Sequence, residues 1–176
     1  MRHAAGMGDD GQAMERADIL ETLAKHRGFL RQTVEGLSDE QAASSPTVSQ
    51  LCVGGLIKHV GQVESTWARF IVEGPAEQQM DEAAYAAHAA GFRMEEGETV
   101  AGLLAGYDEV ARRSDELVAT VPSLDASHPL PEAPWFPPGA RWTARRVFLH
   151  IVAETAQHAG HADIIRETID GAKTMG

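Results

Sequence analysis

Apolar residues recur at helical spacing along most of this chain, whereas the alternation typical of half-buried strands is scarce. The periodic stretches cover about residues 13–35, 49–73, 99–120 and 143–170, and glycine or proline follows several of them, as expected at helix ends. A capping-box pattern at 38–41 predicts a short helical turn, and 81–90 is expected to be helical or irregular. The pattern predicts an all-α fold, a four-helix bundle.

The segments outside these helices divide the chain further. Prolines crowd residues 121–140, and their density excludes helix and sheet interiors. We therefore expect a long ordered Pro-rich loop, or a lid, before the last helix. Residues 1–12 are small, polar and Gly-rich, so they are expected to form a flexible leader. Residues 13–173 are expected to form one domain.

Charge and cysteine content exclude several classes of function. The chain has 15 Lys and Arg against 26 Asp and Glu, a net charge of −11. This balance argues against a nucleic-acid partner, which requires a basic surface. No apolar run approaches the length of a membrane span, so no membrane partner is expected. A single cysteine cannot form an internal disulfide, and we expect a cytoplasmic protein.

The last predicted helix carries an unusual set of polar residues. On a helical wheel His150, Glu154, His158 and His161 fall within an arc of about 80°, inside the apolar stripe. His59 likewise falls on the apolar stripe of the 49–73 helix. A carboxylate turned into a bundle core is costly unless it is paired, hydrogen-bonded or bound to a metal.

A divalent metal accounts for both anomalies together. Imidazole nitrogen and carboxylate oxygen suit Zn²⁺, Ni²⁺, Fe²⁺ or Mn²⁺. Two ligands one helical turn apart and a third from a facing helix leave one position open for water or substrate. A single histidine on an apolar face is more often an ordinary core residue, and that interpretation stays open here. A ferritin-like site and a zincin are disfavoured, because Glu-x-x-His pairs and His-Glu-x-x-His are absent.

Three segments carry a family resemblance. The run Glu-x-x-x-His-x-Gly-His-x-Asp-Ile-Ile-Arg-Glu at 154–167, Leu-Ile-Lys-His at 56–59 and Leu-Ser-Asp-Glu-Gln at 37–41 resemble the DinB/YfiT-like superfamily of metalloenzymes, in its mycothiol-transferase-like branch. The similarity extends from about residue 19 to 171. It implies an up-down-down-up four-helix bundle with a metal at one end.

The resemblance also implies a ligand set. The superfamily's first ligand, a histidine on the second helix, corresponds to His59. The common His-x-x-x-His pair is absent from the last helix of this chain, but related mycothiol-dependent isomerases have Glu-x-x-x-His there. Glu154 and His158 match that form. His161 is the next candidate, either to replace or to supplement one of them.

By the same resemblance, the chain is expected to be a metal-dependent thiol S-transferase, with zinc as the first choice of metal. A low-molecular-weight thiol such as mycothiol, bacillithiol or glutathione would become a metal-bound thiolate and attack an electrophile. The alternatives are a metal-dependent hydrolase on the same site and a non-catalytic metal-binding bundle or stress-response scaffold. We expect no catalytic residue beyond the metal ligands, and a homodimer.

Further expectations concern the residues around the metal site. Four arginines are candidates to bind a carboxylate of the cosubstrate: Arg141, Arg145, Arg146 and Arg166. Arg166 and Trp67 are the cofactor-binding candidates, although Arg166 also fits a pair with Glu167, Asp163 or Asp170 on the helix surface and Trp67 fits the core. His150 is interpreted as a residue that orients a metal ligand.

Overall fold

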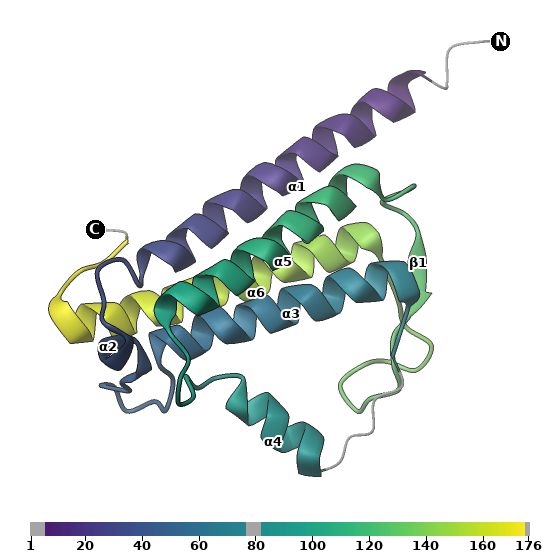
Figure 1. The fold of residues 1–176 in the computed structure, drawn as a ribbon. Helices are drawn as coiled ribbons and strands as arrows, with labels where there is room; N and C mark the ends of the chain where they lie inside the picture. The colour runs from purple at the N-terminus through teal and green to yellow at the C-terminus, as the bar shows by residue number, and fades with distance from the viewer. Residues whose placement is uncertain (1–5, 77–81, 175–176) are drawn as a thin grey trace.

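Four long helices dominate the structure. The computed structural model describes residues 6–76 and 82–174. In these ranges the elements are α1 (Gly6–Gln32), α2 (Asp39–Ala43), α3 (Val53–Glu73), α4 (Glu82–Ala90), α5 (Val100–Thr120), β1 (Ser127–Pro129), β2 (Arg141–Thr143) and α6 (Ala144–Asp170). Figure 1 shows α1, α3, α5 and α6 running side by side, with the shorter α2 and α4 outside them. The prediction of an all-α four-helix bundle is confirmed.

Each long helix packs on two others. α1 lies against α5 and α6, and α3 lies against the same two helices from the other side. The core consists of two apolar clusters. One contains Leu23, Phe70 and Phe148, and the other contains Leu30, Val60 and Ile165. The residues between these clusters form a separate level of the bundle, and both polar groups described below lie at or beside that level.

Capping residues set several helix boundaries where the sequence predicts them. Thr143 caps α6 by accepting a hydrogen bond from the Arg146 backbone N–H, and Gly171 ends the helix at a φ of 79°. Thr99 caps α5 in the same way. Ser38 and Gln41 form the predicted capping box at α2.

Other boundaries differ from the prediction. α1 begins at Gly6, so residues 6–12, expected in the leader, are helical here; extending an existing helix is far less costly than starting one. Residues 1–5 lie outside the described part. α3 begins at Val53, four residues later than expected, because the Cys52 sulfur accepts the Gly55 N–H as a cap. The Pro-rich loop contains a strand, β1, which pairs antiparallel with β2. β1 is short and its proline stands at its last residue, where little sheet bonding is lost.

The glycines at the start of α3 permit a close contact. A Cβ on Gly55 would collide with the backbone oxygen of Phe92, so the segment after α4 can approach α3 only over a glycine. This contact brings Phe92 beside the first turns of α3. Among the described residues, no helix has the length and apolar character needed to cross a membrane.

Candidate metal centre

The bundle brings His59 of α3 together with Glu154 and His158 of α6. One ligand atom from each of the three lies within 4.8 Å of the other two. The ring centroids of His59 and His158 are 4.8 Å apart, and the rings are nearly perpendicular. We call these three residues the histidine cluster. The three side chains are close enough that a small inward movement would let all of them bind one divalent cation.

His59 is the most enclosed member. Its side chain stacks on Phe92 at 3.8 Å between ring centroids, and the His88 ring lies 5.8 Å away, edge-on. Only 5% of His59 is exposed. Burial, with smaller contributions from His158 and His88, lowers the pKa of His59 from 6.5 to about 4. His59 is therefore neutral at pH 7, which is the form that binds metals.

Glu154 has no cationic partner among the described residues. Its carboxylate oxygens lie 3.6 Å from His150 and 3.6 Å from His158, and no Lys or Arg of the described residues lies within ion-pair distance. Burial lowers the pKa of His150, against an opposing effect of Glu154, and Arg146 nearby lowers it further. Burial also lowers the pKa of His158, and Glu154 opposes this while His161 adds to it. The cluster thus has one carboxylate beside neutral imidazoles, a donor set that fits a divalent cation.

Two further predicted residues lie beside the cluster. His161 is one turn beyond His158, with 3.4 Å between their Nδ1 atoms. Trp67 lies against His150, the histidine on the other side of Glu154, with 4.9 Å between the two ring centroids. Trp142 of β2 stacks on Trp67 at 4.7 Å and also contacts His150. An aromatic wall therefore begins next to the cluster.

Arg166 lies elsewhere and is fully engaged. Its guanidinium donates to Asp170 and to the backbone oxygens of Thr33 and Glu35. It thereby joins α6 to the residues that follow α1. Asp170 is one of the three partners that the alternative interpretation expected, but Arg166 is buried and does not form a surface pair.

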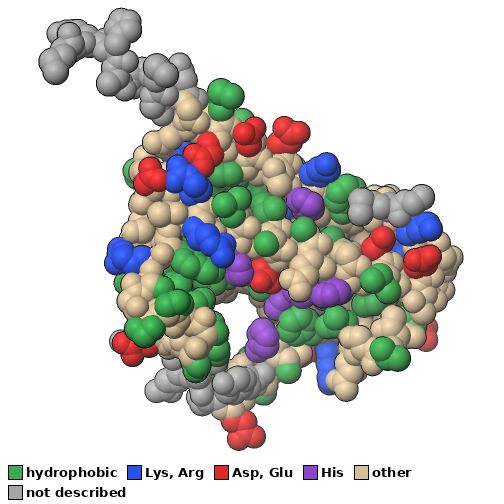
Figure 2. All heavy atoms as spheres, turned by 180° about the vertical axis from the view of Figure 1, so that it is seen from behind, with side chains coloured by type: hydrophobic (Ala, Val, Ile, Leu, Met, Phe, Trp, Pro, Cys, Tyr) green, Lys and Arg blue, Asp and Glu red, His purple; other side chains and the backbone are tan. Residues whose placement is uncertain are grey.

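The cluster is open to solvent on one face of the molecule. Figure 2 shows histidine side chains beside a deep hollow, with an acidic side chain among them and hydrophobic side chains across the hollow. Glu154 and His158 are partly exposed, whereas His59 is buried behind them. A ligand can therefore reach the cluster from the side of α6.

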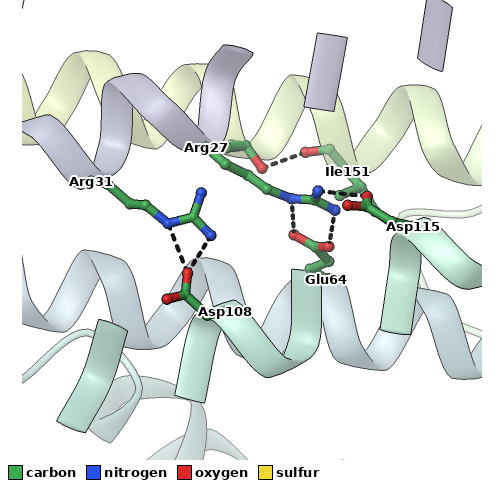
Figure 3. Close-up of polar contacts among 7 residues, drawn as sticks. Arg27, Arg31, Glu64, Asp108, Asp115 and Ile151 are labelled. Atoms are coloured by element: carbon green, nitrogen blue, oxygen red, sulfur yellow. Dashed lines mark hydrogen bonds and ion pairs between the residues drawn. The ribbon is translucent and has the colours of Figure 1, made fainter. Parts of the chain in front are cut away.

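A second polar group lies at the level between the two apolar clusters. The Arg27 guanidinium of α1 donates to both carboxylate oxygens of Glu64 on α3, and its third nitrogen donates to Asp115 of α5 at 2.7 Å. Figure 3 shows the guanidinium between these two carboxylates. We call the three residues the central ion-pair cluster. Arg27 is 1% exposed and Glu64 is 0% exposed.

Sequence reasoning missed several residues of this level. Arg27 and Glu64 stand on apolar stripes, four residues after Leu23 and Val60 respectively. The reasoning that singled out His59 would have found them had it been applied to every helix. His88 and Phe92 carry no comparable signal, because α4 and the segment after it have no periodic pattern that points to the bundle.

Comparisons with known proteins agree with this architecture. The family model described as Mycothiol-S-transferase matches residues 18–171. Among solved structures, YfiT from Bacillus subtilis, described as a probable metal-dependent hydrolase with an unusual four-helix bundle topology, aligns with a TM-score of 0.64 and 17% identity over 94% of this chain and 89% of YfiT. A conserved protein from Enterococcus faecalis aligns with a TM-score of 0.60 and 14% identity, over 88% and 96% of the two chains. No curated protein matches the chain.

Proposed function

The chain belongs to the mycothiol-S-transferase family, and from this premise we propose that it is a metal-dependent thiol S-transferase. The observation that carries the proposal is the histidine cluster, in which two neutral imidazoles and an unpaired carboxylate converge within 4.8 Å. We propose His59, Glu154 and His158 as the ligands, zinc as the metal, and His161 as the residue that supplements or replaces one of them. A cytoplasmic location is proposed from the single cysteine.

The residues of the site have separable roles in this proposal. A divalent cation held there would lower the pKa of a thiol bound at its open position, so that the thiol reacts as a thiolate at neutral pH. His59 is kept neutral by burial and is ready to bind. His150 lies 3.6 Å from Glu154 and orients that carboxylate. Trp67 and Trp142 exclude water from one side and offer apolar surface to the electrophile.

Metal analysis and a conjugation assay test the proposal. Protein purified without an affinity tag is expected to contain about one divalent metal per chain by mass spectrometry, and His59→Ala is expected to lose it. The matched control is His26→Ala, because His26 lies on α1 away from the cluster and contacts Phe29. The metal-loaded protein is then incubated with monobromobimane and each of mycothiol, bacillithiol and glutathione, and conjugates are measured by chromatography.

The outcomes separate the alternatives. Conjugation above the uncatalysed rate with one thiol, lost in His59→Ala and kept in His26→Ala, supports the transferase. Stoichiometric metal without conjugation of any thiol contradicts it and favours a hydrolase or a non-catalytic bundle. Absence of metal after reconstitution contradicts the site itself.

We also propose that the chain forms a homodimer. The support for this is that Leu149 and Ile164 both stand on α6 with 54% and 64% of their surface exposed, and a contact between two copies through α6 would bury them. Light scattering at micromolar concentration is expected to give twice the chain mass of 18.9 kDa. A monomeric mass would contradict the proposal.

A further inference from the structure

Four ionisable residues follow one another at every fourth position of α6: Arg146, His150, Glu154 and His158. Residues four apart on a helix share a face, and contacts confirm that Glu154 lies beside both His150 and His158. The row therefore leads from the histidine cluster toward the N-terminal end of α6. Arg146 stands at that end, and it is one of the four arginines that the sequence offers for binding a carboxylate.

The Arg146 side chain is held in place by an aromatic contact. Its guanidinium carbon lies 4.3 Å from the centroid of the Trp142 ring. Trp142 is itself fixed, because it stacks on Trp67 and contacts His150 edge-on. A guanidinium over an indole face is attracted to it and keeps its N–H groups free at the edge. The cation is thus positioned beside the aromatic wall of the site.

Arg146 differs from the other three arginines that the sequence offered for binding a carboxylate. Arg141 donates to Ser127, Arg145 pairs with Glu15 and Asp125, and Arg166 pairs with Asp170. Within 6–76 and 82–174, the Arg146 guanidinium has neither a hydrogen-bond acceptor nor a carboxylate partner. It therefore keeps five N–H donors available for a ligand.

We propose that Arg146 binds a carboxylate on the molecule whose reacting end lies at the histidine cluster. Eight residues separate Arg146 from Glu154, about 12 Å along the helix axis. The ligand is therefore elongated, with its carboxylate at about that distance from the group that meets the metal. A chain of net charge −11 repels anions in general, so a positioned cation at the site is what selects one. The inference deepens the proposed function, since the ligand is either the thiol or the electrophile.

Binding to cobalt-substituted protein tests this inference without catalysis. The first pair of probes is mercaptooctanoate and mercaptooctanol, which differ only in the group at the far end and are followed by the sulfur-to-cobalt absorption band. The second pair is the monohydroxamate of octanedioic acid and its terminal amide, which bind metal without a thiol. In both pairs the carboxylate form is expected to bind about three- to tenfold more tightly. Mercaptopropionate is too short to reach Arg146 and should show no such advantage over mercaptopropanol.

Two variants locate the effect. Arg146→Gln is expected to remove the carboxylate preference and leave binding of the neutral probes unchanged. Arg69→Gln is the matched control, because Arg69 is also an exposed arginine without an ion-pair partner among the described residues, on α3 in the groove facing α5. Arg146→Lys keeps the charge but loses the planar fork, so it should retain only part of the preference. Circular dichroism checks that each variant folds.

Each result decides the inference. Equal binding of carboxylate and neutral probes, or a preference that survives Arg146→Gln, overturns it. If the thiols give no absorption band but the hydroxamates show the Arg146-dependent preference, the inference stands and the thiol chemistry fails. If neither pair binds, both fail. A turnover assay identifies which substrate carries the carboxylate. It compares an anionic thiol with a neutral electrophile, and a neutral thiol with an anionic electrophile. Arg146→Gln should lower kcat/KM only for the combination whose carboxylate Arg146 binds.

Discussion

The central ion-pair cluster lies between the two apolar clusters, and the histidine cluster lies beside that level, with His59 next to Ile57 and Val60 of the second apolar cluster. In the ion-pair cluster the buried Arg27 meets two carboxylates, and its N–H groups are directed at them. In the histidine cluster Glu154 has only neutral imidazoles beside it. The ion-pair cluster pairs its buried carboxylate with a guanidinium whose three nitrogens all donate to carboxylates. The histidine cluster leaves the Glu154 carboxylate available to bind a cation, and it is open to solvent.

The largest expected effect tests the ion-pair cluster. Arg27→Met leaves the fully buried Glu64 without its bidentate partner, so the free energy of unfolding should fall by about 3–5 kcal/mol. The double variant Arg27→Met with Glu64→Leu should recover most of this, because neither charge is then buried unpaired. Urea denaturation of metal-free protein measures both. A double variant as unstable as the single one would contradict the assignment of Glu64 as Arg27's main partner.

Removing the carboxylate charge of the histidine cluster should have the opposite effect, with little change in stability and a large loss of metal affinity. Glu154→Gln removes a charge that no cation balances, so stability of the metal-free protein should change by less than about 0.5 kcal/mol. Metal affinity should fall at least about 100-fold, as expected when a ligand charge is lost. Competition with a chromophoric chelator measures the affinity. A large loss of stability with unchanged affinity would show that the two clusters do not differ in this way.

The close contact between Gly55 and the Phe92 backbone provides a second test of the histidine cluster. Gly55→Ala places a Cβ against the Phe92 oxygen, so the segment that stacks on His59 must move. We expect a loss of about 1–3 kcal/mol in stability and weaker metal binding. Gly106→Ala on α5 is the control, since a Cβ there would meet no packed neighbour within 4 Å; at that position alanine should stabilise the helix by up to about 1 kcal/mol. Unchanged metal binding in Gly55→Ala would show that Phe92 does not position His59.

The smallest expected effect is a pH dependence of the metal-free protein. The pKa of His59 is about 4 in the folded chain and near 6.5 when it is exposed. Between pH 6.5 and about 4, His59 is protonated in the unfolded chain but not in the folded one. The free energy of unfolding therefore falls as pH decreases, by up to about 1.4 kcal/mol per pH unit. Urea denaturation between pH 7.5 and 4.5 should show a shallower fall for His59→Gln than for wild type. His26→Gln should follow wild type, and a parallel fall in His59→Gln would contradict the buried neutral imidazole.

The sequence predicted the long helices because each carries a long apolar stripe, and it predicted both ends of α6 because Thr143 and Gly171 cap that helix. Spacing also marked His59 and four polar residues of α6 inside the apolar stripes, and the family resemblance selected Glu154 and His158 among those four. Spacing does not show which polar residues will find a counter-charge. Arg27 and Glu64 occupy stripe positions as His59 does, and only the folded bundle, in which α1 and α3 lie on opposite sides of α5 and α6, joins them. The approach of Phe92 to His59 depends on a segment without periodicity, which local patterns cannot place.

The single cysteine of this chain has a practical consequence for its chemistry. Cys52 is 2% exposed, and its sulfur is occupied at the start of α3, where it accepts the Gly55 N–H. An alkylating reagent added to the folded protein therefore meets no accessible thiol belonging to the chain. Consumption of such a reagent reports only the small thiol supplied with it, and the protein should come through its own assay with an unchanged mass.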